Sequence, residues 1–280
     1  MTNKILKIAL VGRTNAGKST LINKIVGEKI SIQNKKINTT QETVMGVKNM
    51  KKTQLIFYDT PGSNFLKSLN KDSKNLKINL WNGIDGSDII FYLIDSKMAN
   101  IKFLYEQIDK LQEVKKKIIV IFNKIDLISN KQLLPLISDL DKNFNIDSFF
   151  TISAIQNIGI DDLLDYIQKY SYVSKWIFKD DEITNKDDIF IISELLRETM
   201  LKYLHKEIPY NINIETSNFK TLKNNDIKIK QKIIINQKRY KKIILGKKGE
   251  MIKKIREDSQ KKMSQILKAK IHLYLEILNA

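Results

Sequence analysis

The sequence predicts an α/β domain with a mostly parallel sheet and helices on both faces, followed by a smaller α+β domain. Five short, nearly continuous apolar runs indicate strands that are buried on both faces, as in a parallel sheet. These runs cover residues 5–11, 55–58, 89–94, 117–122 and 149–152. Helical patterns between the runs, at 103–111 and 161–170, suit right-handed crossover connections.

Beyond residue 172 the pattern changes, which places the first domain at 1–172, a linker at 173–186 and the second domain at 187–280. In the first domain each apolar run passes to a polar residue at its C-terminal end, the edge where open parallel sheets bind ligands. The second domain is expected to contain helices over 187–204 and 249–264, a short helix before 246, and strands over 211–215, 228–235 and 271–276.

Composition and charge narrow the class of protein. Of the 280 residues 42% are hydrophobic, yet no apolar run is long enough for a transmembrane helix. Because there is no secretory signal pattern and no cysteine, we expect a cytoplasmic protein without disulfides. The net charge of +18 is concentrated: Lys220 to Lys262 contain 16 basic and 4 acidic residues. This local excess predicts a surface that binds nucleic acid or, as the alternative, anionic membrane.

Residues 12–19 match the phosphate-binding pattern G-x-x-x-x-G-K-[ST] between a predicted strand and a predicted helix. We call this segment the P-loop, whose backbone N–H groups should face the phosphates of a nucleotide. Lys18 should reach the β- and γ-phosphates, and the Ser19 hydroxyl should coordinate Mg²⁺. The residues expected to contact the nucleotide here are Gly12, Asn15, Ala16, Gly17, Lys18, Ser19 and Thr20.

The sequence Asp-Thr-Pro-Gly at 59–62 follows the second apolar run. Asp59 should meet Mg²⁺ through water, and the Gly62 N–H should face the γ-phosphate. Thr39 and Thr40 lie between the P-loop and this segment, and Thr40 is favoured as the residue that contacts Mg²⁺ and the γ-phosphate in the GTP state. The predicted metal ligands are Ser19, Thr40 and Asp59, and the predicted catalytic residues are Lys18, Thr40 and Gly62.

Asn123, Lys124 and Asp126 indicate which base is bound. A carboxylate at Asp126 can accept hydrogen bonds from N1–H and N2–H₂ of guanine, whereas adenine offers no such pair of donors. Asn123 should tie this loop to the P-loop, and the stem of Lys124 should cover the base. The segment of Ser153 and Ala154 should offer a backbone N–H to guanine O6. The sequence therefore predicts a site for GTP and GDP with Mg²⁺.

The residue after Gly62 is Ser63, which is too short to orient the attacking water as the Gln of Ras-type enzymes does. The sequence also shows no evident internal arginine finger. We therefore expect slow intrinsic GTP hydrolysis, with the missing positioning supplied by another group.

Residues 246–249 form a G-x-x-G loop within the basic region, inside the predicted order α-β-β-α-α-β. This order is that of a KH domain of the second topological type, in which the loop lets the backbone approach RNA phosphates. Ile243, Ile244 and Ile252 are candidates for an apolar strip under the bases. The predicted RNA-binding residues are Lys241, Lys242, Ile244, Gly246, Lys247, Lys248, Gly249, Lys253 and Lys254.

In the order of these motifs the chain resembles the Era family of bacterial GTPases over nearly its whole length. The chain also matches this family at Thr39 and Thr40 and in the segments 194–198, 207–210 and 242–249. The resemblance implies binding to 16S rRNA near its 3′ end and a role in assembly of the 30S small ribosomal subunit. It also implies that Asn15 helps to hold a potassium ion. We also expect a monomer. Gln41 departs from the family, which usually has Arg there.

Two other functions remain open at the level of sequence. One is an RNA-binding module whose nucleotide site acts only as a switch with negligible turnover. The other is a GTPase that uses its basic face to associate with anionic lipid at the inner face of the cell membrane. Both alternatives keep the guanine site. The first differs from a ribosome-assembly GTPase in having negligible GTP turnover, and the second differs in binding lipid instead of RNA.

Overall fold

The computed structural model describes residues 2–27, 44–62, 71–204, 208 and 212–280. The chain divides into two compact units, Met1–Asn185 and Lys186–Ala280.

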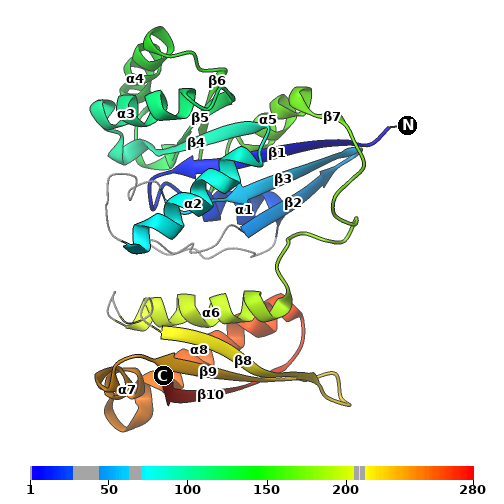
Figure 1. The fold of residues 1–280 in the computed structure, drawn as a ribbon, viewed down its shortest axis with the longest axis vertical. Coiled ribbons are helices and arrows are strands. Elements are labelled where there is room, and N and C mark those ends of the chain that lie inside the picture. The colour runs from blue at the N-terminus through cyan, green and yellow to red at the C-terminus, as the bar shows by residue number, and fades with distance from the viewer. Residues whose placement is uncertain (1, 28–43, 63–70, 205–207, 209–211) are drawn as a thin grey trace. The chain divides into compact units, whose positions relative to one another are not determined.

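The first unit contains a seven-stranded sheet of order β2-β3-β1-β4-β5-β6, with β7 paired to β1 (Figure 1). Neighbours from β3 to β6 pair in parallel, whereas β2 and β7 pair antiparallel. The strands are β1 (Lys4–Gly12), β2 (Val44–Met50), β3 (Thr53–Asp59), β4 (Ile89–Asp95), β5 (Lys117–Asn123), β6 (Ser148–Ile152) and β7 (Tyr172–Val173). The mostly parallel sheet that the apolar runs predicted is therefore confirmed.

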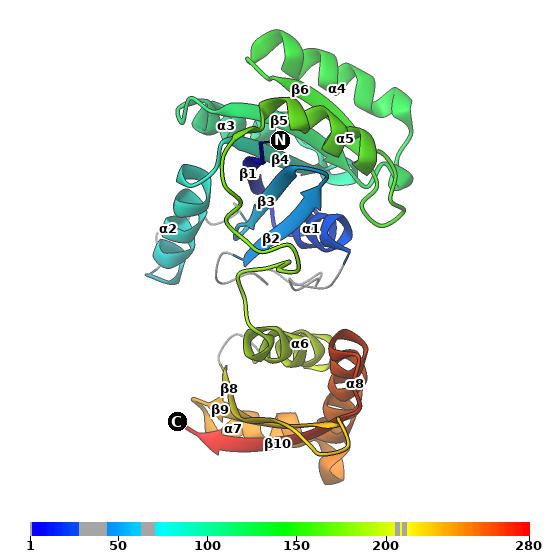
Figure 2. The same ribbon diagram turned by 90° about the vertical axis from the view of Figure 1, so that its right-hand side faces the viewer.

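Helices cover both faces of this sheet. Figure 2 shows α1 and α5 on one face and α2 and α3 on the other. Apolar side chains of α2, α3 and α4 join those of β1, β4 and β5 in one buried cluster, which includes Leu80, Leu104 and Leu140. The helices are α1 (Lys18–Val26), α2 (Lys71–Asp85), α3 (Ile101–Gln112), α4 (Asn130–Asn143) and α5 (Ile160–Ile167).

Among the described residues of this unit, the sequence did not predict strands β2 and β7 or helices α2 and α4. The edge strand β2 contains Gly46, Lys48 and Asn49, which are poor strand formers. Its backbone pairing with β3 stabilises the strand in place of favourable side chains. Helix α4 has Pro135 in its interior, a residue that normally ends a helical pattern. In α2 polar residues outnumber the apolar ones, of which Leu80 and Ile84 are fully buried.

The segment 176–185, expected as part of a linker, packs against β2 and β3. The buried amide of Gln54 donates to the carbonyl of Phe178 at 3.0 Å and accepts from the N–H groups of Ile177 and Phe178, each at 3.0 Å. The N–H of Val47 donates to the Ile183 carbonyl at 2.8 Å, and Gly46 forms a bridge with Thr184. This segment therefore covers part of the free edge of β2, which would otherwise expose unpaired backbone groups.

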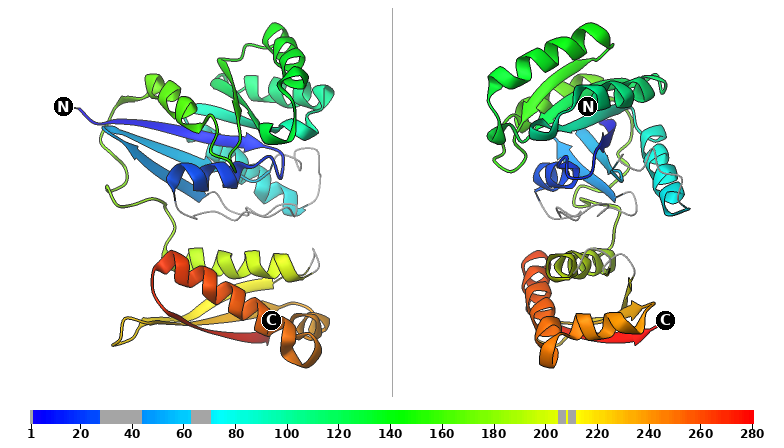
Figure 3. Two further views of the ribbon diagram at one scale, coloured as in Figure 1. Left: turned by 180° about the vertical axis from the view of Figure 1, so that it is seen from behind. Right: turned by 90° about the vertical axis from the view of Figure 1, so that its left-hand side faces the viewer.

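The second unit has the order α6, β8, β9, α7, α8, β10 that was predicted. Its three-stranded sheet has the order β10-β9-β8, with β10 parallel and β8 antiparallel to β9. Figure 3 shows this unit from two further sides. The elements are α6 (Asp188–Tyr203), β8 (Ile212–Thr221), β9 (Ile227–Ile235), α7 (Lys238–Leu245), α8 (Glu250–Leu267) and β10 (Ile271–Asn279).

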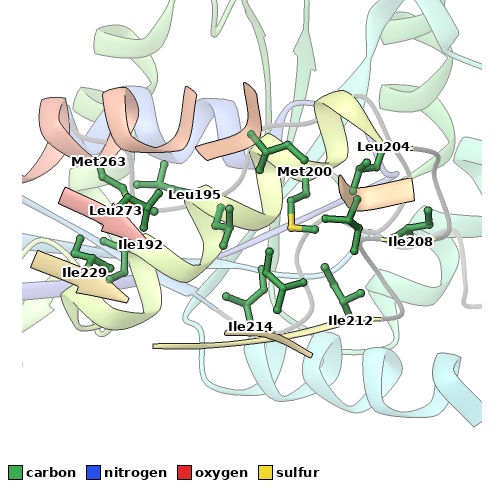
Figure 4. Close-up of a cluster of buried hydrophobic side chains, with 14 of the residues drawn as sticks. Ile192, Leu195, Met200, Leu204, Ile208, Ile212, Ile214, Ile229, Met263 and Leu273 are labelled. Carbon is green, nitrogen blue, oxygen red and sulfur yellow. The ribbon is translucent and has the colours of Figure 1, made fainter. Parts of the chain in front are cut away.

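One apolar core joins the helices and one sheet face of this unit. Figure 4 shows Ile192, Leu195 and Met200 of α6 turned toward strand residues such as Ile214 and Ile229. The inward residues of β9 occur at every second position, as a strand with one buried face requires. Asp187 starts α6, because its carboxylate accepts a hydrogen bond from the Phe190 N–H at 2.7 Å.

Candidate nucleotide site and nucleic-acid interface

The P-loop connects β1 to α1 through two glycines whose backbone other residues would strain. Gly12 has φ 155° and Gly17 has φ 101°. A Cβ on Gly12 would overlap the carbonyl of Leu93, and one on Gly17 would overlap the side-chain amide of Asn123. The loop therefore lies against β4 and β5 so closely that only glycine fits at these two positions.

Lys18 begins α1 with its ammonium group buried in the P-loop. Its Nζ donates to the carbonyls of Gly12 at 3.0 Å and Arg13 at 3.2 Å. Burial lowers the pKa of Lys18 to about 8, against an opposing effect of the nearby Asp59 carboxylate. Two neutral carbonyls are poor partners for a buried cation, so a phosphate would stabilise the charged form strongly.

Asp59 ends β3 and is fully buried beside the P-loop. Next to it, the Thr60 hydroxyl donates to the Leu10 carbonyl at 2.5 Å and so fixes the end of β3 to β1. Gly62 lies so close to Thr14 that a Cβ would come within 2.8 Å of the Thr14 N–H nitrogen. The backbone of 59–62 is thereby held against the P-loop, as the predicted contact of Gly62 with a γ-phosphate needs.

The residues present suit a magnesium ion. Ser19 supplies a hydroxyl in the first turn of α1, and Asp59 supplies a carboxylate; oxygen donors of this kind are those that Mg²⁺ prefers. When bound, the ion would neutralise charge on the β- and γ-phosphates. The first turn of α1 contains no acidic residue, so its N-terminus remains favourable for an anion. Thr39, Thr40 and Ser63 lie outside the described residues.

Asn123 joins three loops at the carboxyl edge of the sheet. This side chain is 2% exposed, and its Nδ2 donates to the Ala16 carbonyl of the P-loop at 2.9 Å. Its Oδ1 accepts from the N–H groups of Lys124 at 2.8 Å and Ala154 at 3.0 Å. One amide therefore sets the distance between the phosphate-binding loop and the two loops expected to read the base.

Asp126 follows Asn123 in a short helical turn, and its orientation is set by Ser153. The Ser153 hydroxyl donates to Asp126 Oδ1 at 2.6 Å, which orients the carboxylate that is expected to accept from guanine. The N–H of Ser153 donates to the Ile158 carbonyl and that of Ala154 donates to Asn123. The contact of this segment with guanine O6 therefore stays a prediction. It requires that the N–H of Ser153 or of Ala154 donate to guanine O6 as well as to its present acceptor.

Lys124 crosses from the base loop to the P-loop. Its Nζ donates to the Asn15 carbonyl at 2.6 Å and forms an ion pair of 2.6 Å with Asp95 at the end of β4. The sequence predicts that the stem of Lys124 covers the base, but it does not predict the ion pair with Asp95. The signal was present, since Asp95 is the polar residue that ends the third apolar run.

The G-x-x-G loop forms a tight turn between α7 and α8. Gly246 has φ 70° and a Cβ there would come within 2.5 Å of the Met251 Cβ, and Gly249 has φ 79°. Lys248 between them also has positive φ, at 50°. Lys247 and Lys248 are exposed, and so are Lys241, Lys242, Lys253 and Lys254 on the two flanking helices. The loop thus presents backbone and cationic side chains to solvent together.

The prediction that Ile244 contacts RNA is wrong. Ile244 is fully buried among the side chains of the second unit's core, so it cannot touch a base. Helix α7 turns Ile244 inward and its neighbour Ile243 outward, where Ile243 is 39% exposed. Successive residues of a helix point in different directions, and the sequence alone did not fix which isoleucine packs inside.

Comparisons with known proteins agree with this geometry. Residues 7–124 match the family model described as 50S ribosome-binding GTPase, and residues 207–279 match the KH domain. GTPase Era of Rickettsia conorii is 35% identical over 272 residues, 97% of this chain and 79% of that protein. GTPase Era of Rickettsia prowazekii is 36% identical over 278 residues, 98% of this chain and 93% of that protein.

The chain belongs to the Era GTPase family. It is a GTP-hydrolysing enzyme with a C-terminal KH domain, as the sequence predicted. An Era variant from Aquifex aeolicus bound to GDP·AlF₄⁻ is 30% identical, with a TM-score of 0.91 over 99% of this chain and 94% of that chain. An Era structure with MgGDPNP and nucleotides 1506–1542 of 16S ribosomal RNA is also 30% identical, with a TM-score of 0.89 and the same coverage.

We predict that nucleotide binding takes up protons at alkaline pH. The pKa of Lys18 is about 8 in the free protein, and phosphate must raise it. At pH 8.5 part of Lys18 is neutral before binding and charged afterwards, whereas at pH 6.5 it is charged throughout. Calorimetry of GDP binding in two buffers of different ionisation enthalpy should give different apparent enthalpies at pH 8.5, in excess of any difference at pH 6.5. Equal buffer dependence at both pH values would contradict the prediction.

Proposed function

We propose that this Era-family GTPase binds 16S rRNA near its 3′ end through its KH domain and assists 30S subunit assembly. The solved Era complex with 16S rRNA nucleotides shares the fold of 99% of this chain at 30% identity. The observation that carries the proposal is the G-x-x-G turn, in which two glycines of positive φ and two exposed lysines present a backbone to phosphates. Small subunits are assembled in the cytoplasm, so we place the protein there.

The proposed reaction is Mg²⁺-dependent hydrolysis of GTP to GDP and phosphate at a low intrinsic rate. Ser19 and Asp59 would hold the ion, which supplies charge neutralisation when bound. Lys18 would stabilise negative charge on the β- and γ-phosphates, and Gly62 and Thr40 would contact the γ-phosphate from the opposite side. Ser63 is too short to orient water, which supports a slow rate without RNA or another partner.

A potassium ion is proposed as a further cofactor. Asn15 is exposed at the turn of the P-loop with φ 69°, and its carbonyl accepts from Lys124. An asparagine there adds an amide oxygen near the position of the phosphates, and such oxygens suit a monovalent cation. This ion would take the place of an arginine finger.

We also propose that the protein acts as a monomer, and that its basic region associates weakly with anionic membrane at low salt. No helix among the described residues is long and apolar enough to cross a membrane. The 16 basic residues between Lys220 and Lys262 would attract any polyanion, and the G-x-x-G geometry favours RNA over lipid.

Reversing the charge of the loop lysines should separate the two sites. The variant Lys247→Asp/Lys248→Asp is expected to lose binding of a 37-nucleotide RNA with the sequence of the 16S rRNA 3′ end by at least about tenfold, because two phosphate contacts become repulsive. GDP affinity should be unchanged, since the P-loop lies in the other unit. Fluorescence anisotropy with labelled RNA measures the first quantity and labelled GDP the second. The control Lys131→Asp/Lys142→Asp changes the net charge equally at two exposed α4 positions outside the basic region; RNA affinity equal to the control would overturn the KH assignment.

Basal turnover should depend on the monovalent cation. In single-turnover assays we expect a slow rate in sodium and a higher rate in potassium at equal ionic strength. Asn15→Ala should reduce this difference without preventing GTP binding. Equal rates in both salts for the unaltered protein would refute the potassium proposal, and no turnover in either would favour the nucleotide site as a switch only.

A further inference from the structure

The outer face of the KH sheet carries a row of lysines that the G-x-x-G site does not use. In β9 the inward positions are apolar or Gln231, and the outward positions are Lys228, Lys230 and Lys232, followed by Ile234. The helices pack on the opposite face through the apolar core. We call the following residues the outer sheet face: Lys220 of β8, Lys228, Lys230 and Lys232 of β9, and His272 and Tyr274 of β10.

The pairing of the strands places these lysines against one another. Lys220 lies directly opposite Lys228 in the antiparallel pair of β8 and β9. Like charges in direct cross-strand positions lower stability, and alternatives such as Thr would pair better. Stability of the sheet therefore does not account for this arrangement.

Acidic residues of the strands do not neutralise this end of the sheet. Glu215 and Glu276 both lie opposite Lys232, at the far end of the lysine row. Near the other end, the Asp226 carboxylate accepts from His272 Nε2 at 2.7 Å and lies 3.9 Å from Lys270. Hydrogen bonding from His272 holds the pKa of Asp226 below its usual range, so this carboxylate is already engaged.

An aromatic ring lies within the lysine row. Tyr274 is 52% exposed, lies opposite Lys230, and has the Lys228 ammonium 5.5 Å from its ring centroid. An exposed aromatic ring flanked by cations on a sheet is the arrangement on which unpaired bases stack in single-strand-binding proteins. Stacking supplies contact with bases, and the lysines supply contact with phosphates.

The spacing of the lysines suits an extended strand of RNA. Successive outward residues of a β-strand are about 6.6 Å apart, a repeat similar to that of phosphates in an extended single strand. Anionic lipid would instead favour a broad apolar surface beside the cations. The outward positions from Lys228 to Lys232 are polar, and the apolar Ile234 and Leu278 lie beyond them as one pair, so the lysine row itself has the character of a single-strand site.

The outer sheet face is separate from the G-x-x-G loop. Figure 1 shows α7 at the end of the sheet where β10 finishes, whereas the turn between β8 and β9 lies at the other end. Lys220, Lys228 and His272 lie near that turn, within a few residues of the strand ends that flank it. An RNA would therefore have to extend past the G-x-x-G loop to reach them.

We propose that the outer sheet face is a second RNA-binding surface, which takes single-stranded RNA continuous with the nucleotides held at the G-x-x-G loop. Lys228 and Lys230 contact successive phosphates, Lys220 adds positive charge beside Lys228, and one base stacks on Tyr274. This inference rests on the proposed function of the KH domain as an RNA-binding module. It assigns to the same RNA a second contact, which lengthens the bound segment and raises its affinity.

The test compares two RNA probes on the full chain: an 8-nucleotide single strand and a 37-nucleotide RNA, both with the sequence of the 16S rRNA 3′ end. In the variant Lys228→Gln/Lys230→Gln, affinity for the long RNA should fall by about fivefold or more, and the slope of log affinity against log salt should decrease by about 1 to 2. Affinity for the short RNA should stay within about twofold. Unchanged affinity for the long RNA would overturn the proposal.

Matched control variants distinguish three causes of a change in RNA affinity: loss of charge, loss of base stacking and misfolding. Lys131→Gln/Lys142→Gln removes the same charge from two exposed positions on α4, outside the basic region, and should leave both affinities unchanged. Tyr274→Ala should lower the affinity for the long RNA by about fivefold or more. Tyr274→Phe retains a stacking ring and should leave this affinity unchanged. Equal effects of Ala and Phe would exclude stacking. These side chains lie at the surface, so their replacement should not disturb the fold. Unchanged affinity of a variant for the short RNA, which binds at the G-x-x-G loop, shows that its KH domain is folded.

The remaining outcomes distinguish this inference from the function on which it rests. If Lys247→Asp/Lys248→Asp abolishes binding of both probes and Lys228→Gln/Lys230→Gln affects neither, the KH assignment stands and the second surface is refuted. If the unaltered protein binds neither probe, both fail. If Lys228→Gln/Lys230→Gln lowers sedimentation with phosphatidylglycerol vesicles but not RNA affinity, the surface is a lipid contact and the proposal is overturned.

Discussion

The nucleotide site depends on one buried amide. Asn123 donates to the P-loop at Ala16 and accepts from the loops of Lys124 and Ala154, all within 3.0 Å. Its position also excludes a side chain from Gly17. Because a buried amide without partners is costly, these loops are held in one arrangement before any nucleotide arrives. Recognition of phosphate and base can then occur at a fixed separation.

Much of this arrangement follows from the sequence because the parallel strands are apolar throughout and end at polar residues. The order of motifs fixed which loops meet, and the roles expected for Lys18, Asn123 and Asp126 rest on that order. Edge strand β2 and helix α4 were not predicted, because their stability comes from pairing and packing that override weak local preference. The ion pair between Lys124 and Asp95 depends on two strands being neighbours, which periodicity does not specify.

In the KH domain the element order and the basic region were readable, but the direction of single side chains was not. Ile243 and Ile244 are chemically equivalent in the sequence, and only the packing of α7 turns Ile244 into the core. The outer sheet face was missed for a related reason. Alternation showed that β9 has two faces, but the pairing of Lys220 with Lys228 and the approach of Tyr274 arise from the register of three strands.

The most direct test of the central role of Asn123 is the GDP affinity of Asn123→Ala, measured by fluorescence titration beside Asn143→Ala. Asn143 is an exposed amide of α4 that donates to the Asp139 carbonyl, so it serves as a matched control. Loss of two or more buried hydrogen bonds predicts at least about a hundredfold weaker binding for Asn123→Ala and no change for the control. GDP affinity that is equal in the two variants would contradict the account that this amide holds the phosphate and base loops together.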